Sequence, residues 1–273
     1  MDRSGLVASL FGAPRALVGV VHVGALPGTP NGGRPVRALA EAALADARAY
    51  RAAGFHAVMI ENMHDRPYLR RQVGPEVVAA MTAVLARLEE VGIPIGVQVL
   101  AGANREALAV AHAGGAAFVR AEGFVFAHVA DEGLMESDAG ALLRYRRAIG
   151  AEGVRIFADV KKKHSAHAIT ADVDLADTVH AAEFFLADGV VVTGSATGRP
   201  ALPADVEAAV QAGGIPVLVG SGITAENVAA YALADGYIVG TFIKEGADWT
   251  RPVDPRRADA LVRAVSALPP PAR

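Results

Sequence analysis

Short apolar runs rich in β-branched residues alternate with longer, Ala-rich segments along almost the whole chain. The short runs are typical of buried strands, and the longer segments carry apolar residues at helical spacing. This alternation predicts a parallel sheet wrapped by helices. The expected strands are Leu17–Val23, Ala57–Asn62, Ile95–Leu100, Ala117–Ala121, Val154–Lys161, Gly189–Thr193, Pro216–Val219 and Tyr237–Gly240.

Helices are expected in the gaps between these strands. Several helical segments end at a glycine, which commonly follows a helix C-terminus. The last segment opens with Asp254-Pro255, an N-cap residue followed by proline at the first helical position. The expected helices are Arg37–Ala53, Pro75–Val91, Arg105–Ala113, Ala139–Ile149, Asp172–Ala187, Pro203–Gly213, Thr224–Ala234 and a closing helix that ends at about Leu268.

Eight strands spaced by roughly 20 to 40 residues predict an α/β fold of the single (β/α)8 or TIM-barrel type. We expect one domain over residues 1–273, with the barrel over about 17–268, because no long linker divides the chain. The gap between the fourth and fifth strands holds an extra loop. A doubly wound sheet is the alternative, but its G-x-G-x-x-G fingerprint is absent after the first strand, where the chain reads Gly24-Ala25-Leu26-Pro27-Gly28.

Composition excludes several classes of protein. Hydrophobic residues make up 52% of the chain, which rules out disorder over most of it. The net charge of -3 gives no general reason to bind a nucleic-acid polymer. The absence of cysteine excludes disulfides and thiol nucleophiles and fits a cytoplasmic location. Two uncharged stretches, Ala16–Gly33 and Ala208–Ala225, contain prolines and glycines, so we expect no integral membrane association. The chain opens with Asp2 and Arg3, and its first apolar stretch is interrupted by Pro14 and Arg15, so no secretory signal is expected.

Polar residues gather at the ends of the expected strands, where barrel enzymes place their working side chains. Any one of them is equally consistent with an ordinary loop residue, but their convergence on one rim predicts an active site. The catalytic candidates are His22, Glu61, Asp159 and Lys161, and the substrate-binding candidates are Asn62, His64, Gln98, Arg120, Glu122, Lys163 and Thr193.

Glycines mark the last two strand ends, in the strings Val219-Gly220-Ser221-Gly222-Ile223-Thr224 and Val239-Gly240-Thr241. Glycine lets backbone N–H groups approach an anion, and a following helix N-terminus adds its dipole. Barrel enzymes frequently bind phosphate with these two loops. We therefore predict a phosphate site formed by Gly220, Ser221, Gly222, Gly240 and Thr241. In the alternative interpretation, the glycines only form tight turns and Thr224 caps a helix.

The second strand ends in Glu61-Asn62-Met63-His64-Asp65, which gathers two carboxylates, an amide and an imidazole. This set suits proton transfer or metal binding, although His64 and Asp65 are also candidates for capping the next helix or pairing with Arg66. No cofactor is required by the sequence. A divalent metal held by His22, Glu61, His64 and Asp159 is a minor alternative, because nothing in their spacing demands one.

The fifth strand ends in Asp159-Val160-Lys161, and alternation places Asp159 and Lys161 on the same, inward side. Lys161 is then a clamp for phosphate or carboxylate, or a Schiff-base amine. The neighbouring Asp159 favours the ammonium form and hence the clamp. The following residues, Lys162 to His164, are expected in a solvated loop, too short a basic run for nucleic-acid binding.

Several strings at these strand ends form a recognisable set. They are Gly19-Val-Val-His22-Val-Gly-Ala-Leu-Pro27-Gly28, Glu61-Asn62, Arg120-Ala-Glu-Gly123, Asp159-Val-Lys161-Lys-Lys163-His164, Thr193-Gly-Ser-Ala-Thr-Gly198 and Gly220-Ser-Gly-Ile-Thr224. From about Leu17 to Val265 the chain resembles the BtpA/SgcQ family. The resemblance implies a barrel of the ribulose-phosphate-binding type, and the family takes its name from a photosystem I biogenesis factor. One departure from the general phosphate-barrel pattern is Lys244, which is expected near the anion or facing solvent.

Two functions are consistent with these features. The first is an enzyme that holds the anion of a phosphorylated sugar, nucleoside or nucleotide derivative on the last two loops. It would catalyse isomerisation, lyase cleavage, or glycosidic-bond cleavage or transfer, with Glu61 or Asp159 as base and His22 or Lys161 as acid or electrostatic stabiliser.

The second function is a non-catalytic assembly or biogenesis factor that binds protein partners through its outer helices. An exposed apolar patch at Phe124–Val129 or Phe184–Phe185 would favour it. For the first function the expected partner is a small anionic substrate. A homo-oligomer is expected in either case, since barrels often self-associate.

Overall fold

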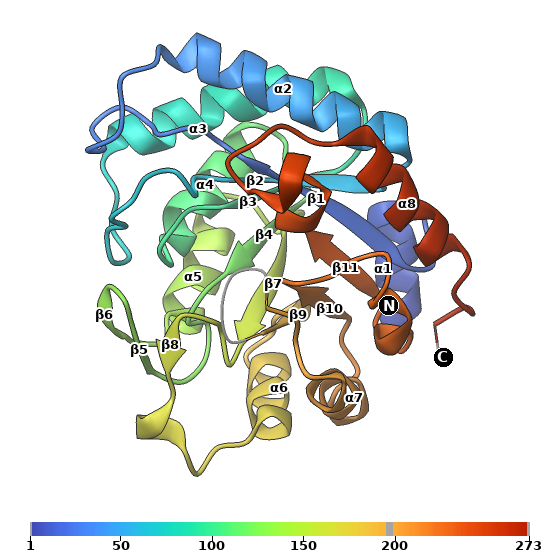
Figure 1. Cartoon of the computed structure of the whole chain (residues 1–273). Coiled ribbons are helices and arrows are strands. Elements are labelled where there is room, and N and C mark those ends of the chain that lie inside the picture. The colour runs from blue at the N-terminus through green and yellow to red at the C-terminus, as the bar shows by residue number, and fades with distance from the viewer. Residues whose placement is uncertain (1, 195–198, 272–273) are drawn as a thin grey trace.

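The computed structural model describes residues 2–194 and 199–271, so the 195–198 part of the Thr193–Gly198 motif lies outside the described residues. Eight parallel strands close into a barrel in the order β1-β11-β10-β9-β7-β4-β3-β2, which confirms the predicted fold (Figure 1). Each strand begins and ends within two residues of its predicted bounds. The strands are β1 (Ala16–His22), β2 (Ala57–Glu61), β3 (Ile95–Gln98), β4 (Phe118–Ala121), β7 (Arg155–Val160), β9 (Gly189–Thr193), β10 (Val217–Gly220) and β11 (Gly236–Val239).

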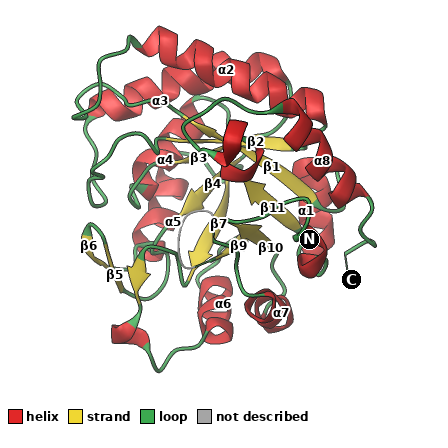
Figure 2. Ribbon diagram, in the orientation of Figure 1, coloured by secondary structure: helices red, strands yellow, loops and turns green. Residues whose placement is uncertain are grey.

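Helices surround the barrel as predicted (Figure 2). None of the described helices is long and apolar enough to cross a membrane. The capping box of Asp174 and Asp177 fixes where α6 begins, so that helix is shorter than expected. The outer helices are α2 (Val36–Ala53), α3 (Pro75–Leu88), α4 (Asn104–Ala113), α5 (Ala139–Ala148), α6 (Leu175–Phe184), α7 (Pro203–Ala212) and α8 (Pro255–Ser266).

The helix predicted over Thr224–Ala234 is wrong. The chain instead forms a turn and a short 3-10 helix, η3 (Val228–Tyr231). Asn227 accepts a hydrogen bond from the Thr224 N–H at 2.8 Å and donates one to the Gly222 carbonyl at 2.7 Å. Such side-chain bonds to the local backbone compete with the helical hydrogen bonds.

Two further elements were not predicted. Helix α1 (Arg3–Phe11) starts at the N-cap Asp2 and closes the N-terminal end of the barrel, where the Phe11 ring lies 5.6 Å from that of Phe118. A small sheet of β5 (His128–Ala130), β6 (Gly133–Met135) and β8 (Ser165–Ala166) fills the loops after β4 and β7. The extra loop expected between the fourth and fifth barrel strands therefore carries its own structure.

Strand alternation divides the barrel interior into an apolar part and a polar rim. Inward side chains such as Val18, Met59 and Phe157 form an inner apolar core together with α1. One step further along each strand the inward residues become polar, and in the strand register His22 lies beside Glu61, which lies beside Gln98. The fold thus brings strand-end residues that are distant in sequence to one rim.

Candidate active site

A cavity with two neighbouring lobes opens at the carboxyl ends of the strands, and both lobes are lined by Glu61, Met63, Arg120 and Lys163. The first lobe is completed by His22, by Ser221–Ile223 and by Val239–Phe242. The second lobe is completed mainly by residues of the β2, β3, β4 and β7 ends and of the small sheet: Arg66, Tyr68, Gln98, Leu100, Ala101, Glu122, Asp131, Glu132, Lys162, His164 and Trp249.

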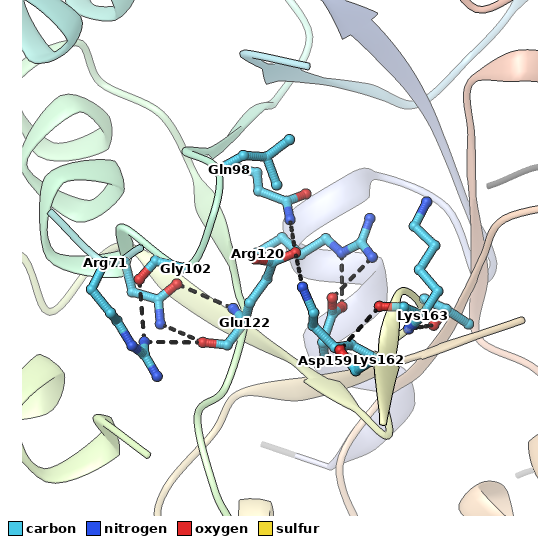
Figure 3. Close-up of polar contacts among 12 residues, drawn as sticks. Arg71, Gln98, Gly102, Arg120, Glu122, Asp159, Lys162 and Lys163 are labelled. Carbon is cyan, nitrogen blue, oxygen red and sulfur yellow. Dashed lines mark hydrogen bonds and ion pairs between the residues drawn. The ribbon is translucent and has the colours of Figure 1, made fainter. Parts of the chain in front are cut away.

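Arg120 and Asp159 form a buried, two-pronged ion pair on neighbouring strands (Figure 3). Nε and Nη2 of Arg120 donate to the two carboxylate oxygens at 2.8 and 3.0 Å. Burial alone would lower the pKa of Arg120, but the charge of Asp159 raises it above its ordinary value. Nη1 has no part in the pair and lies 4.0 Å from where a Cβ on Gly220 would stand. Asp159 thus anchors a permanent cation beside the glycine loops.

Glu61 lies in the inward row of β2 with a side chain only 9% exposed, and it lines both lobes. No donor in the described part of the chain bonds its carboxylate. Burial raises its pKa, whereas Arg120 and Lys163 act in the opposite direction. A carboxylate that is buried, unpartnered and exposed to a cavity has the properties of a general base.

The prediction that Lys161 points inward beside Asp159 is wrong. Strand β7 ends at Val160, and Lys161 adopts a left-handed backbone (φ 48°) that breaks the alternation. Its ammonium donates to the Thr170 carbonyl at 3.2 Å and to the Val173 carbonyl. Lys161 therefore holds the following loop and does not line either lobe.

The expectation of a solvated loop is also wrong for the next two lysines. Lys162 is buried, and its ammonium lies 3.3 Å from Oε1 of Glu122. Lys163 lines both lobes, and burial followed by the charge of Arg120 lowers its pKa. Its backbone N–H donates to Thr193 Oγ1 at 3.1 Å, which fixes the chain at this point. Lys163 therefore occupies the place expected for Lys161.

His22 is a neutral imidazole in this site. Nδ1 lies 2.9 Å from the Trp249 carbonyl oxygen, and since a carbonyl only accepts, Nδ1 carries the hydrogen. Burial, reinforced by the charge of Lys244, lowers the pKa of His22 to about 3. Its Nε2 therefore presents a lone pair, 3.0 Å from where a Cβ on Gly240 would stand.

Trp249 is a site residue that sequence reasoning missed. It lies in the loop between β11 and α8, and its ring packs 4.6 Å from the His64 ring and 5.0 Å from the Arg66 guanidinium. His64 thus packs on Trp249 and lines neither lobe. The sequence feature that could have pointed to it is that Trp249 is the chain's single tryptophan.

The glycine loops of the first lobe expose backbone donors. Ser221 and Gly222 both have left-handed φ values (74° and 66°), and a Cβ on Gly222 would lie 2.3 Å from the nitrogen of Pro200. The N–H groups of Gly222 and Ile223 donate to no described group. Thr241 opens a 3-10 helix of three residues, η4 (Thr241–Ile243), so the expected helix dipole is not available at either loop.

Lys244 neither approaches these loops nor faces solvent, contrary to expectation. It is buried and forms an ion pair with Asp46 on α2. Asn62 is likewise occupied: its oxygen accepts from the Leu100 N–H at 2.7 Å and its Nδ2 donates to Asp65 at 2.9 Å. Asp65 in turn accepts from the Leu26 N–H at 2.8 Å, so this network joins the loops after β1, β2 and β3.

The described residues hold no group of three or more histidines, aspartates or glutamates placed to bind a metal ion. The four residues considered for a metal, His22, Glu61, His64 and Asp159, therefore do not assemble as such a site.

Comparison with known proteins identifies the family. The model of the BtpA family matches residues 13–267. The chain belongs to the BtpA family. A BtpA-family relative, an uncharacterized mitochondrial protein of Caenorhabditis elegans, is 43% identical, with 96% of this chain and 98% of the relative covered. The photosystem I biogenesis protein BtpA of Synechocystis is 36% identical, with 94% and 90% covered.

The BtpA-family barrel is also similar to solved structures. One is the (S)-3-O-geranylgeranylglyceryl phosphate synthase of Thermoplasma acidophilum in complex with sn-glycerol-1-phosphate, with a TM-score of 0.62. The two sequences are 15% identical, and the match covers 97% of this chain and 98% of the synthase. At this identity the likeness concerns the fold.

Proposed function

We propose that this protein is an enzyme that performs acid–base chemistry on a phosphorylated sugar, nucleoside or nucleotide derivative. The observation that carries the proposal is the composition of the first lobe. It unites two glycine loops, one of which has N–H groups that donate to no described group, with a guanidinium nitrogen of Arg120 outside the ion pair, the buried carboxylate of Glu61 and the half-buried ammonium of Lys163.

The phosphate docks on the loops after β10 and β11. The N–H groups of Gly222 and Ile223 and the hydroxyls of Ser221 and Thr241 supply donors, and Arg120 supplies charge. This arrangement resembles the phosphate sites built from the last two loops of other barrels. A structural neighbour bound to sn-glycerol-1-phosphate supports the same ligand class.

The reacting part of the substrate faces Glu61 and Lys163. Glu61 removes a proton from the substrate, and Lys163, whose pKa burial has lowered, returns a proton to a developing oxyanion or leaving group. His22 contributes an acceptor at Nε2. This chemistry serves isomerisation, lyase cleavage, or glycosidic-bond cleavage or transfer.

The test pairs ligand binding with turnover. Thermal shifts and calorimetry with phosphorylated compounds and their unphosphorylated analogues should show binding that requires the phosphate. Ser221→Asp adds a negative charge to the loop, and Asp tolerates the left-handed backbone. It should raise the phosphate Kd at least about tenfold by charge repulsion, whereas the neutral, isosteric Ser221→Asn should not.

Turnover of a compound found in this way should fall about 100-fold or more in Glu61→Gln and in Lys163→Met, as expected for general acid–base groups. Both variants should retain a native thermal transition. Full turnover in a folded Glu61→Gln protein would refute the assignment of the base.

The second candidate function is an assembly factor that binds protein partners. A relative is named a photosystem I biogenesis protein, and the end of α6 leaves Phe184 82% exposed and Leu186 67% exposed. In the other predicted segment, Phe124 is fully buried, whereas Phe126 and Val129 are 38% and 42% exposed. Absence of any phosphate-dependent binding would favour this function. A homo-oligomer and a cytoplasmic location stay predictions that neither proposal requires.

A further inference from the structure

The second lobe is distinguished by buried acceptors that have no donor. Among the described residues, five buried side-chain atoms lack a hydrogen-bond partner, and three of these are oxygens of residues that line this lobe. The three are Gln98 Oε1, Glu122 Oε2 and Glu132 Oε2. Unpaired buried polar groups are costly, so a cluster of them in one cavity indicates a ligand that satisfies them.

The positions of the Gln98 and Glu122 acceptors are fixed by their neighbours. Oε1 of Glu122 takes both available donors, Gln98 Nε2 and Lys162 Nζ, each at 3.3 Å (Figure 3). The other carboxylate oxygen takes none. Gln98 and Glu122 are 2% and 6% exposed. Asn104 accepts from the Glu122 N–H at 3.1 Å and donates to its carbonyl at 2.8 Å, so the backbone that carries this carboxylate is also held.

The charge of the second lobe is balanced. Its acidic lining residues are Glu61, Glu122, Asp131 and Glu132, and its basic ones are Arg66, Arg120, Lys162 and Lys163. A cationic amine that approached the carboxylate of Glu122 would be repelled by the ammonium of Lys162, which already lies beside it. A second phosphate would meet three unpaired oxygens. Both signs of ligand charge are therefore disfavoured, and a neutral group rich in donors fits.

We infer that the second lobe binds the hydroxyl-bearing end of the substrate, with Gln98 and Glu122 selecting for hydroxyl donors. This inference rests on the proposed function, because the phosphate occupies the first lobe and the two lobes share Glu61, Arg120 and Lys163. A hydroxyl donates one hydrogen and accepts another. Adjacent hydroxyls can thus satisfy the free oxygens and also accept from Lys162.

The nature of the substrate follows from this arrangement. A polyol or sugar chain with a terminal phosphate would span both lobes and place its middle carbons beside Glu61 and Lys163. A nucleobase is the competing neutral group, but its edge offers fewer donors for three acceptors. The structure thus assigns a sugar phosphate rather than a base-bearing ligand to this site.

Calorimetric binding of D-ribose 5-phosphate and of pentyl phosphate tests the inference, since the two probes share a phosphate and five carbons and differ in their hydroxyls. Because the hydroxyls of the sugar phosphate satisfy acceptors that pentyl phosphate leaves unpaired, wild type should bind the sugar phosphate at least about tenfold more tightly. Glu122→Gln replaces an oxygen by a donor, so the preference should fall below about threefold. The Kd of inorganic phosphate should stay unchanged.

Asp131→Asn is the matched control, because it removes the same charge from the lining of the lobe but no buried unpaired acceptor. It should retain the tenfold preference. Equal affinity of wild type for the two probes, a loss of the preference in Asp131→Asn, or a Glu122-dependent preference for uridine over D-ribose would each overturn the inference.

A different result would refute the proposed function: neither probe, nor inorganic phosphate, would bind. In that case free D-ribose at millimolar concentration decides the inference. Glu122-dependent binding of ribose upholds it, and absence of such binding refutes it.

Discussion

The two ends of the barrel satisfy their polar groups in opposite ways. At the N-terminal end, α1 brings Phe11 against Phe118, and the buried carboxylate of Asp235 accepts from the Val217 N–H at 2.7 Å and from Arg3. At the mouth, no described donor bonds the carboxylate of Glu61, and three oxygens of lining residues lack partners in the same part of the chain. One exception at the closed end is Arg3 Nη2, which is buried without a partner.

This difference indicates that the closed end of the barrel mainly stabilises the fold, whereas the mouth mainly binds and converts a ligand. Unpaired buried groups destabilise a fold, and they are retained where a ligand or a reaction uses them. The closed end should therefore respond to mutation mainly through stability. The mouth should respond mainly through binding and turnover, and some mutations there should stabilise the protein.

The largest effect on stability is expected from an exception to this division, the buried Arg120–Asp159 ion pair at the mouth. Asp159→Asn leaves the buried Arg120 cation without its counter-charge, and we expect a loss of about 3–5 kcal/mol in the free energy of unfolding. Urea denaturation measures it. The double variant Arg120→Met/Asp159→Leu should recover most of the loss, since it buries no unpaired charge. A single variant as stable as wild type would contradict this role for the pair.

A slightly smaller loss is expected at the closed end. Phe11→Ala removes a ring that packs against Phe118 and Phe157 and should cost about 3 kcal/mol. Phe11→Leu should cost less than half of that, because most of the volume is kept. The phosphate Kd of both variants should equal that of wild type. A weakened phosphate affinity in Phe11→Ala would show that the two ends are coupled.

The barrel strands and much of the polar rim at the mouth could be predicted from the sequence. Predominantly apolar runs of four to eight residues located all eight strands, and the strand ends gave Glu61, Gln98, Arg120 and Glu122 as rim residues. A hydrophobic run defines a strand because parallel barrel strands are buried on both faces. The rim then follows from topology alone.

The remaining features depend on backbone details that have no periodic signal. A single left-handed residue at Lys161 turns that side chain away and brings Lys163 into the site. The strands of the small sheet have only two or three residues, too few to show alternation. Trp249 reaches the mouth on a loop, which carries no pattern. These are the parts that set the chemistry of the second lobe and of His22.

His22 at the mouth should make the stability of the protein depend on pH. The pKa of His22 is about 3 when folded and 6.5 in the reference state, so between these values the unfolded chain binds more protons. Stability therefore rises with pH across this window, by at most about 1.4 kcal/mol per pH unit for one histidine. Urea unfolding from pH 4.5 to 7 should show a shallower slope in His22→Gln. Identical slopes would refute the neutral, buried state of His22.

The same acid-to-amide change should have opposite effects on stability at the two ends, and its effect at the mouth should be the smallest of all. Burial raises the pKa of Glu61, so its ionised form is disfavoured by folding at neutral pH, and Glu61→Gln should slightly increase the free energy of unfolding. Burial also raises the pKa of Asp235, but the charge of Arg3 and the hydrogen bond from the Val217 N–H oppose this. Asp235→Asn removes a carboxylate that accepts from both groups, and should decrease the free energy of unfolding by about 1–3 kcal/mol. Both are the same acid-to-amide change, and urea denaturation at pH 7 compares them directly. If Glu61→Gln destabilised the protein as much as Asp235→Asn does, Glu61 would be a structural carboxylate. The closed end and the mouth of the barrel would then not differ in how they satisfy their buried carboxylates.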